Sequence, residues 1–170
     1  AIKYAKDKSL LNKKKESFPI YEKVEVPISK PFLTQSCRRN YIDAFDSSWI
    51  SSLGKYIKEF EFQFSKYIGT NYCLSTSNGT TALELAIAAL NLDEKSEIII
   101  PDFTFAAVSN AVLAKGHIPV CVDVSPIDWN INLEEIKNSI TNKTRAVIVV
   151  HSYGIPAIDL ENICRFCKEQ

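Results

Sequence analysis

Apolar residues in the first part of the chain recur with the spacing of an α-helix. Between residues 55 and 68 they stand at positions 57, 60, 64, 67 and 68, with charged residues such as Lys58 and Glu59 between them. This spacing predicts an amphipathic helix that ends at Gly69. A shorter helix is predicted over residues 37–45, after the stiff backbone at Pro31.

Beyond residue 71 the pattern changes, and short apolar runs alternate with helical stretches. Strands are predicted over residues 72–75, 97–100, 118–122 and 145–150, and helices over residues 80–90, 105–115, 133–140 and 158–170. Continuous apolar runs such as Ile98-Ile99-Ile100 are typical of strands that are buried on both faces. We therefore predict an α/β fold, a mostly parallel sheet with helices on both faces.

These patterns divide the chain into three parts. Residues 1–30 are rich in lysine and lack apolar periodicity, which predicts a solvated arm. Residues 31–70 form an N-terminal helical segment, and residues 71–170 form the first part of the α/β domain. Because the last helical pattern still continues at Gln170, we expect this domain to be incomplete at the C-terminus and the chain to be a piece of a longer protein.

The composition is that of a globular protein and argues against several classes of partner. Hydrophobic residues make up 46% of the 170 residues, which is enough for a core. The 20 Lys and Arg residues balance the 20 Asp and Glu residues, so the net charge does not favour binding to nucleic acid or to an anionic membrane. No apolar run approaches the roughly 20 residues of a membrane span. We expect a soluble, cytoplasmic protein with no nucleic-acid or membrane partner.

The cysteines do not predict a metal site. Cys164 and Cys167 form a C-x-x-C pair, but the apolar residues around them follow a helical pattern. Because no second pair completes a zinc site, we interpret the two residues as structural, reduced thiols. No cluster of His, Cys and Asp elsewhere in the sequence has the spacing of metal ligands.

The turn around Gly79 is a candidate anion site. It joins the predicted strand 72–75 to an Ala- and Leu-rich helix, and the first amides of a helix have no internal partner and lie at the positive end of its dipole. Gly79 allows close approach to the backbone, and Ser77, Thr80 and Thr81 can add hydroxyl donors. The turn matches neither a P-loop nor a dinucleotide fingerprint. An ordinary strand-to-helix turn without a ligand is the alternative.

Other candidates follow the later strands, because ligands of parallel sheets bind at the carboxyl ends of the strands. Phe103 and Phe105 follow the second predicted strand, where they are either core aromatics or a platform for a flat ring. His151 follows the fourth predicted strand next to Tyr153, in either a structural or a binding role. His117 precedes a strand at the opposite edge, where we expect it to be exposed to solvent.

Several motifs together resemble the pyridoxal-phosphate-dependent sugar-nucleotide aminotransferases. They stand in the order and spacing of that family at residues 48–57, 60–61, 77–83, 101–105, 119–124 and 151–154. The segment from Trp49 to Tyr56 is most similar to the GDP-perosamine synthases. The resemblance covers residues 24–170 and implies part of the large domain of a fold-type-I enzyme.

The resemblance also implies a cofactor, pyridoxal 5'-phosphate, and roles for individual residues. Gly79 and Thr80 would hold the cofactor phosphate, and Phe105 would stack on the pyridine ring. Residues near a sugar-nucleotide pocket would be Trp49, Lys55, Tyr56, His151 and Tyr153.

The implied activity is transfer of an amino group from an amino acid, glutamate, to a nucleotide-linked 4-keto-6-deoxy sugar, in a homodimer. The family's Schiff-base lysine would lie beyond residue 170, so no catalytic residue is assigned in this chain, and we expect the chain alone to be inactive. Two alternatives stay open. They are a non-catalytic regulatory or binding member of the same fold and a 3-dehydratase of the same family, in which histidine replaces the lysine.

Overall fold

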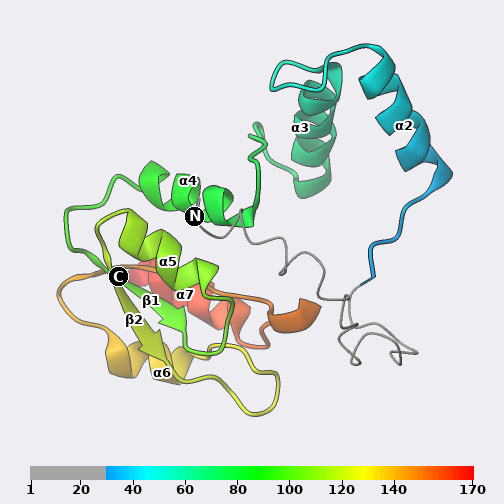
Figure 1. Ribbon diagram of the computed structural model, residues 1–170. Helices are drawn as coiled ribbons and strands as arrows, with labels where there is room; N and C mark the ends of the chain where they lie inside the picture. Colours follow the sequence, from blue (N-terminus) through cyan, green and yellow to red (C-terminus); the bar gives the residue numbers. More distant parts are fainter. Residues whose placement is uncertain (1–29) are drawn as a thin grey trace, which may run out of the picture. The chain divides into compact units, whose positions relative to one another are not determined.

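The computed structural model describes residues 30–170 (Figure 1). These residues fall into two compact units, which divide between Tyr56 and Ile57. The predicted lysine-rich arm, residues 1–30, lies outside the described residues except for Lys30. The predicted domain limits at residues 30 and 70 stay predictions. Among residues 30–170, no helix combines the length and the apolar character that crossing a membrane requires.

The described part of the first unit contains α2 (Gln35–Asp46) and the start of α3 (Lys55–Ile68). Helix α2 begins where the Thr34 hydroxyl accepts the Cys37 amide at 3.2 Å, which satisfies one of the unpaired first-turn donors. The prediction of a helix over 37–45 is confirmed, with extra residues at both ends. The predicted helix over 55–68 is confirmed with the same bounds.

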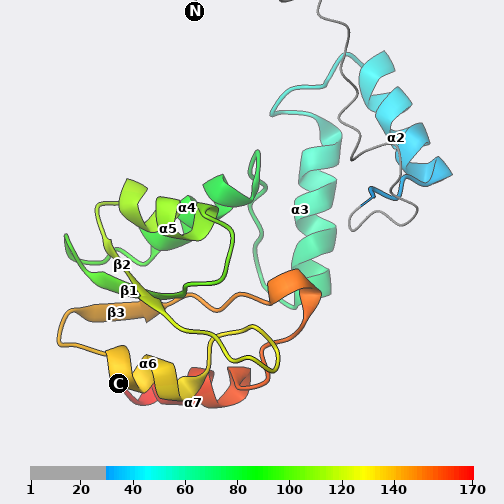
Figure 2. The ribbon, with the colours of Figure 1, turned by 60° about the horizontal axis from the view of Figure 1, so that its bottom comes forward.

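The second unit is built on a parallel sheet in the order β2-β1-β3, formed by β1 (Glu97–Pro101), β2 (Ile118–Val122) and β3 (Thr144–Val147). Four helices cover it, α4 (Gly79–Ala89), α5 (Ala107–Ala114), α6 (Leu133–Ser139) and α7 (Leu160–Glu169). Figure 2 shows α4 and α5 on one face of the strands and α6 and α7 on the other. The predicted α/β class with helices on both faces is confirmed.

The central strand β1 supplies both halves of the core. Ile98 and Ile100 pack with residues of α4 and α5, whereas Ile99 packs with Ile136 of α6 and Ile163 of α7. All three strand residues are at most 1% exposed. Successive side chains of a strand point to opposite faces, so an uninterrupted run of isoleucine is what a strand with helices on both sides requires.

Two strand predictions need correction. Residues 72–75 do not form a strand within the described chain. Instead, the Ser75 amide and hydroxyl both donate to Glu61 Oε1 at 2.8 Å, and Tyr72 and Leu74 are 89% and 71% exposed. A strand needs the backbone of a neighbouring strand, which a local apolar run cannot supply. The last strand ends at Val147 rather than at residue 150, although the Ile148 amide still donates to the Ile99 carbonyl at 2.9 Å.

Candidate functional site

The N-terminus of α4 is held in place by Asn78. The Asn78 side-chain oxygen accepts the Thr81 amide at 2.9 Å and the Thr81 hydroxyl at 3.2 Å, and the Asn78 carbonyl accepts the Ala82 amide. Thr81 is therefore occupied by the cap and is less available to a ligand than the sequence suggested. The sequence analysis did not identify this cap, although asparagine directly before the first residue of a helix is a preferred N-cap.

The amides of Gly79 and Thr80 are the open donors of this turn. Both lie in the first turn of α4, and neither amide has an acceptor among residues 30–170. A Cβ placed on Gly79 would meet no described atom within 4 Å, so the space above this turn is open. The geometry fits a bound anion such as a phosphate group.

We expect replacement of Asn78 by alanine to lower the free energy of unfolding by about 1 kcal/mol, because the cap of α4 is lost. Asn78→Ser keeps a side-chain acceptor and is the matched control. It should lower the free energy of unfolding by only about 0.3 kcal/mol. Urea unfolding measures both differences. Equal stabilities of the Ala and Ser variants would contradict the role of Asn78 as a cap.

A cavity of about 360 Å³ lies where the chain leaves β1 and β3, and its lining residues are Phe103, Thr104, Phe105, Val150, His151, Ser152 and Tyr153. The neighbouring positions of β1 and β3 in the sheet bring these two segments together. Phe105 is 83% exposed, so it is not the core aromatic that was one of the two alternatives. Its exposed ring is available to a flat ligand.

The structure brings three of the predicted residues, Phe105, His151 and Tyr153, to this cavity, but Gly79 and Thr80 are not among its lining residues. Figures 1 and 2 show that the start of α4, the start of α5 and the short 3-10 helix η2 (Ser152–Gly154) lie at the same edge of the sheet. The turn at the start of α4 and the cavity therefore share one edge, the edge at which parallel strands end.

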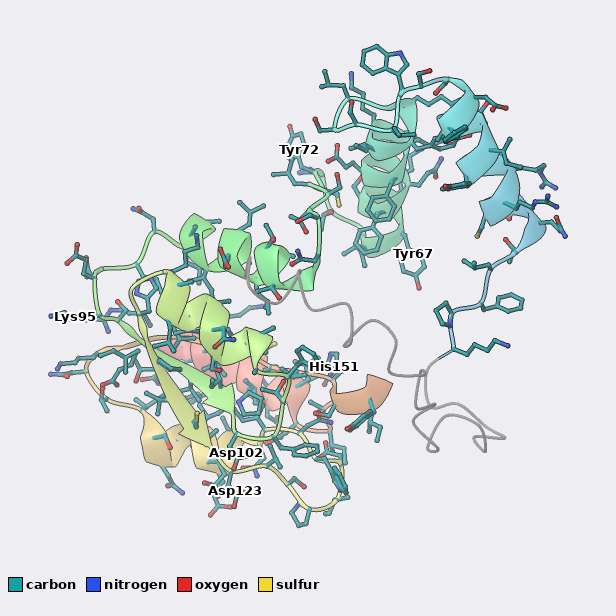
Figure 3. All side chains as sticks on the ribbon, viewed as in Figure 1. Tyr67, Tyr72, Lys95, Asp102, Asp123 and His151 are labelled. Carbon is teal, nitrogen blue, oxygen red and sulfur yellow. The ribbon has the colours of Figure 1, made fainter. Side chains whose placement is uncertain are left out.

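His151 has a defined ring orientation. Its Nδ1 accepts the Ala157 amide at 3.1 Å, which makes Nε2 the proton-bearing nitrogen of the neutral ring. Figure 3 labels His151 beside η2. Because His151 is exposed and lines the cavity, its Nε2–H group can donate to an oxygen atom of a ligand.

The prediction that His117 is exposed to solvent is wrong, because this residue is only 8% exposed. Its amide donates to the Val112 carbonyl at the end of α5, which draws the residue inward, and its Nδ1 has no hydrogen-bond partner within the described chain. This histidine lies before β2, whereas His151 follows β3, so the two lie toward opposite ends of the parallel strands.

In the first unit, Lys55 and Tyr56 both bind the carboxylate of Asp43. The Tyr56 hydroxyl donates to Asp43 Oδ2 at 2.8 Å, and the Lys55 ammonium forms an ion pair with the same oxygen. The hydrogen bond from Lys55, followed by that from Tyr56, lowers the pKa of Asp43. These interactions join α2 to the start of α3, and the binding roles of Lys55 and Tyr56 stay predictions.

Trp49 lies in a tight loop and is 58% exposed. A Cβ on Gly54 would come within 2.6 Å of the Trp49 carbonyl oxygen, so this close approach requires glycine. The loop conformation therefore depends on Gly54, and the predicted contact of Trp49 with a substrate stays a prediction.

Groups of three or more His, Cys, Asp or Glu side chains that could hold a metal ion do not occur among residues 30–170. Cys164 and Cys167 are free and exposed on α7.

The chain is similar in sequence to known sugar aminotransferases. GDP-perosamine synthase of Escherichia coli O157:H7 is 39% identical over 145 residues, which cover 85% of this chain and 40% of that protein. This chain therefore spans about two fifths of the length of that curated relative.

Solved structures with a similar fold include the aminotransferase from Psychrobacter cryohalolentis, with a TM-score of 0.77 and 30% identity over 84% of this chain and 36% of that one. NtdA from Bacillus subtilis, solved with bound cofactor PMP, has a TM-score of 0.74 and 29% identity, and the match covers 88% of this chain and 36% of that one. A third is the E. coli GDP-4-keto-6-deoxy-D-mannose-3-dehydratase with bound hydrated PLP, with a TM-score of 0.68 and 27% identity over 74% of this chain and 34% of that one.

The DegT/DnrJ/EryC1/StrS aminotransferase family matches residues 33–170, which are most of the sequence. The match includes the capped turn at the start of α4 and both segments that line the cavity. The resemblance predicted from the motifs is thereby confirmed, and the chain belongs to the DegT/DnrJ/EryC1/StrS aminotransferase family.

Proposed function

We propose that this chain forms the phosphate-binding and ring-binding part of a pyridoxal-phosphate site in a sugar aminotransferase. A protein built on it would transfer an amino group from glutamate to a nucleotide-linked 4-keto-6-deoxy sugar, as a homodimer. The observation that carries the proposal is the shared sheet edge of two features, the open amides of Gly79 and Thr80 and the exposed ring of Phe105. Family membership and similarity to GDP-perosamine synthase support the substrate class.

The residues at this edge fit the proposed cofactor. The two amides and the dipole of α4 suit a phosphate group, and the open space at Gly79 leaves room for it. Phe105 offers a flat apolar surface to a heterocycle. When bound, pyridoxal phosphate supplies an electron sink and a carrier for the amino group. The chain's own residues would bind and orient it.

His151 and Tyr153 are proposed to contact the sugar nucleotide, because both line the cavity next to Phe105. The Nε2–H group of His151 would donate to a substrate oxygen, and the ring of Tyr153 would cover one side of the cavity. Trp49, Lys55 and Tyr56 are proposed as further substrate contacts, which the similarity to GDP-perosamine synthase supports.

The chain by itself is proposed to bind the cofactor without catalysing the transfer. None of its lysines lies in the family's lysine motif, and the relative that it matches extends over more than twice its length. Without an activated amine, the proton transfers of the reaction lack their acid and base.

A 3-dehydratase is the second candidate function. The similarity to GDP-4-keto-6-deoxy-D-mannose-3-dehydratase favours it over unrelated activities. Lysine at the family's catalytic position would support the aminotransferase, and histidine there would support the dehydratase. Another residue at this position would support a non-catalytic member.

The phosphate site makes a direct prediction about ligand binding. We expect pyridoxal phosphate to bind this chain at least about tenfold more tightly than pyridoxal, because only the former has a charged group for the amides at the start of α4. Asn78→Asp retains the cap but adds a negative charge beside these amides. It should therefore weaken binding of pyridoxal phosphate and leave binding of pyridoxal unchanged. Equilibrium dialysis measures the affinities of the wild type and Asn78→Asp for both ligands, and the same two measurements on Asn78→Ser serve as the neutral cap control.

Equal affinities for the two ligands would overturn the proposed phosphate site. The activity requires a separate measurement, namely glutamate-dependent formation of an amino sugar from GDP-4-keto-6-deoxymannose, followed by chromatography and mass spectrometry. We expect no product from residues 1–170 alone and product from a gene product that carries them together with the family's lysine motif. Consumption of the sugar without amination would point instead to the dehydratase.

A further inference from the structure

The segment Asp128–Asn130, between β2 and α6, carries two buried polar side chains that bind a distant part of the chain. Asn130 is 1% exposed and Asp128 is 6% exposed. Burial of polar groups is costly unless they are hydrogen-bonded. Their partners lie mainly in residues 151–158, the segment that leaves the cavity and leads to α7.

Asn130 holds both ends of η2. Its side-chain oxygen accepts the Ser152 amide at 2.9 Å, and its side-chain nitrogen donates to the Ile155 carbonyl at 3.0 Å. Between these two bonds, Tyr153 adopts a left-handed backbone conformation with φ 53°. A non-glycine residue in this region requires support from its surroundings, and the two bonds of Asn130 provide it.

Asp128 holds the far end of the same segment. Its Oδ2 accepts the Ile158 amide at 3.0 Å. The residue before Ile158 is Ala157, whose amide donates to His151 Nδ1. The bond to Ile158 thus places the donor that orients the His151 ring. Asp128 and Asn130 also bind each other, since the Asn130 amide donates to Asp128 Oδ1 at 3.3 Å.

Trp129, between the two buried residues, contacts Phe103, one of the residues that line the cavity. Its ring packs edge-on against Phe103, with centroids 5.1 Å apart, and Phe103 lies 6.5 Å from the ring of Tyr153. One short segment therefore contacts both sequence regions that line the cavity.

We propose that Asp128 and Asn130 are positioning residues that fix the 151–158 segment, so that His151 presents Nε2–H and Tyr153 its ring to the substrate. This assignment rests on the proposed function, because it concerns the same cavity. Neither residue lines the cavity, and both act through the backbone of the segment that does. The hydrogen bonds of Asp128 and Asn130 to residues 152–158, which we call the brace, also keep His151 in one tautomer. In this tautomer the ring is a hydrogen-bond donor to a substrate oxygen.

The protein has two histidines, so nitrogen NMR of the imidazole rings tests the tautomer of His151 directly, at about pH 8.5, about two units above the ordinary pKa of imidazole. In the wild-type chain, His151 should be protonated at Nε2, and the Ser152 and Ile158 amides should exchange slowly with solvent. In Asn130→Ala, we expect a mixture of His151 tautomers and exchange of the Ser152 amide that is about a hundredfold faster.

Ile136→Val is the matched control, since it weakens the core under α6 without touching the brace. It should lower the melting temperature but leave the His151 tautomer and the Ser152 exchange unchanged, and His117 serves as an internal reference. If Asn130→Ala does not fold, Asn130→Asp replaces it as the test variant. It keeps the side-chain acceptor for the Ser152 amide and loses the donor to the Ile155 carbonyl, so the His151 tautomer is the signal that should change.

Unchanged His151 and Ser152 signals in folded Asn130→Ala would overturn the proposal, and so would an unchanged His151 tautomer in folded Asn130→Asp. So would a wild-type chain in which His151 is already a tautomer mixture and the Ser152 amide is unprotected. The NMR and exchange measurements need no ligand. Failure of wild-type protein to bind pyridoxal phosphate would therefore count against the proposed function and not against the brace.

Discussion

Ile99→Ala is expected to lower the free energy of unfolding by about 3 to 4 kcal/mol. Ile99 is fully buried in the central strand and packs with Ile136 and Ile163, so the substitution removes apolar contacts and leaves a cavity between the sheet and two helices. Because domains of this size have stabilities of only about 5 to 15 kcal/mol, this one change removes a large fraction of the total. Urea unfolding, with extrapolation to zero denaturant, measures the difference.

Ile127→Ala is the control for this prediction. Ile127 is 82% exposed, so the same chemical change should alter the free energy of unfolding by less than about 0.5 kcal/mol. A loss at Ile99 as small as that at Ile127 would mean that the sheet is not covered by α6 and α7 in solution.

Asp128→Ala is expected to destabilise the protein by about 2 to 4 kcal/mol, because the backbone amides of Asn130 and Ile158 lose a charged acceptor in a buried position. Asp128→Asn should cost less, since the amide keeps one oxygen but turns a donor toward one of the two N–H groups. The measurement is urea unfolding of the three proteins at neutral pH.

The effect of Asp128 should also depend on pH. The hydrogen bond from the Ile158 amide is the largest cause that lowers the pKa of Asp128 in the folded protein. A lowered pKa means that the ionised carboxylate stabilises the fold above the unfolded value of about 3.9, and that this contribution is lost as the pH falls through the folded value. The stability difference between the wild type and Asp128→Asn should therefore be constant from about pH 5 to 7 and shrink below about pH 4.

Glu94→Gln is a suitable control for the pH series, because Glu94 is exposed in a turn. Its stability difference from the wild type should stay close to zero over the same range. A difference for Asp128→Asn that grows on acidification would contradict the role of the ionised Asp128 as an acceptor.

The α/β class and most of the elements could be predicted from the sequence, because their signals are local. The run Ile98-Ile99-Ile100 identified a strand buried on both faces, and the spacing of apolar residues after Lys55 identified a helix with its bounds. The turn at Gly79 and the position of Phe105 after β1 were likewise visible, since both follow from where a strand ends and a helix begins.

Residues 72–75 could not be assigned correctly in the same way. Their apolar character satisfies the local condition for a strand, but pairing depends on a neighbouring backbone that no local pattern encodes. His117 is a similar case. Its burial is decided by the carbonyl of Val112 and the packing at the end of α5, and not by its position before a strand.

The sequence by itself determined the α/β class, the parallel sheet and the family, and it predicted the edge of the sheet at which a ligand would bind. Only the tertiary structure decided that Asp128 and Asn130 hold the segment with His151 and Tyr153. The hydrogen bonds involved join residues 22 to 30 positions apart, and such contacts leave no periodic signal. They arise because the sheet brings the ends of β2 and β3 to one edge, where buried polar groups must find partners.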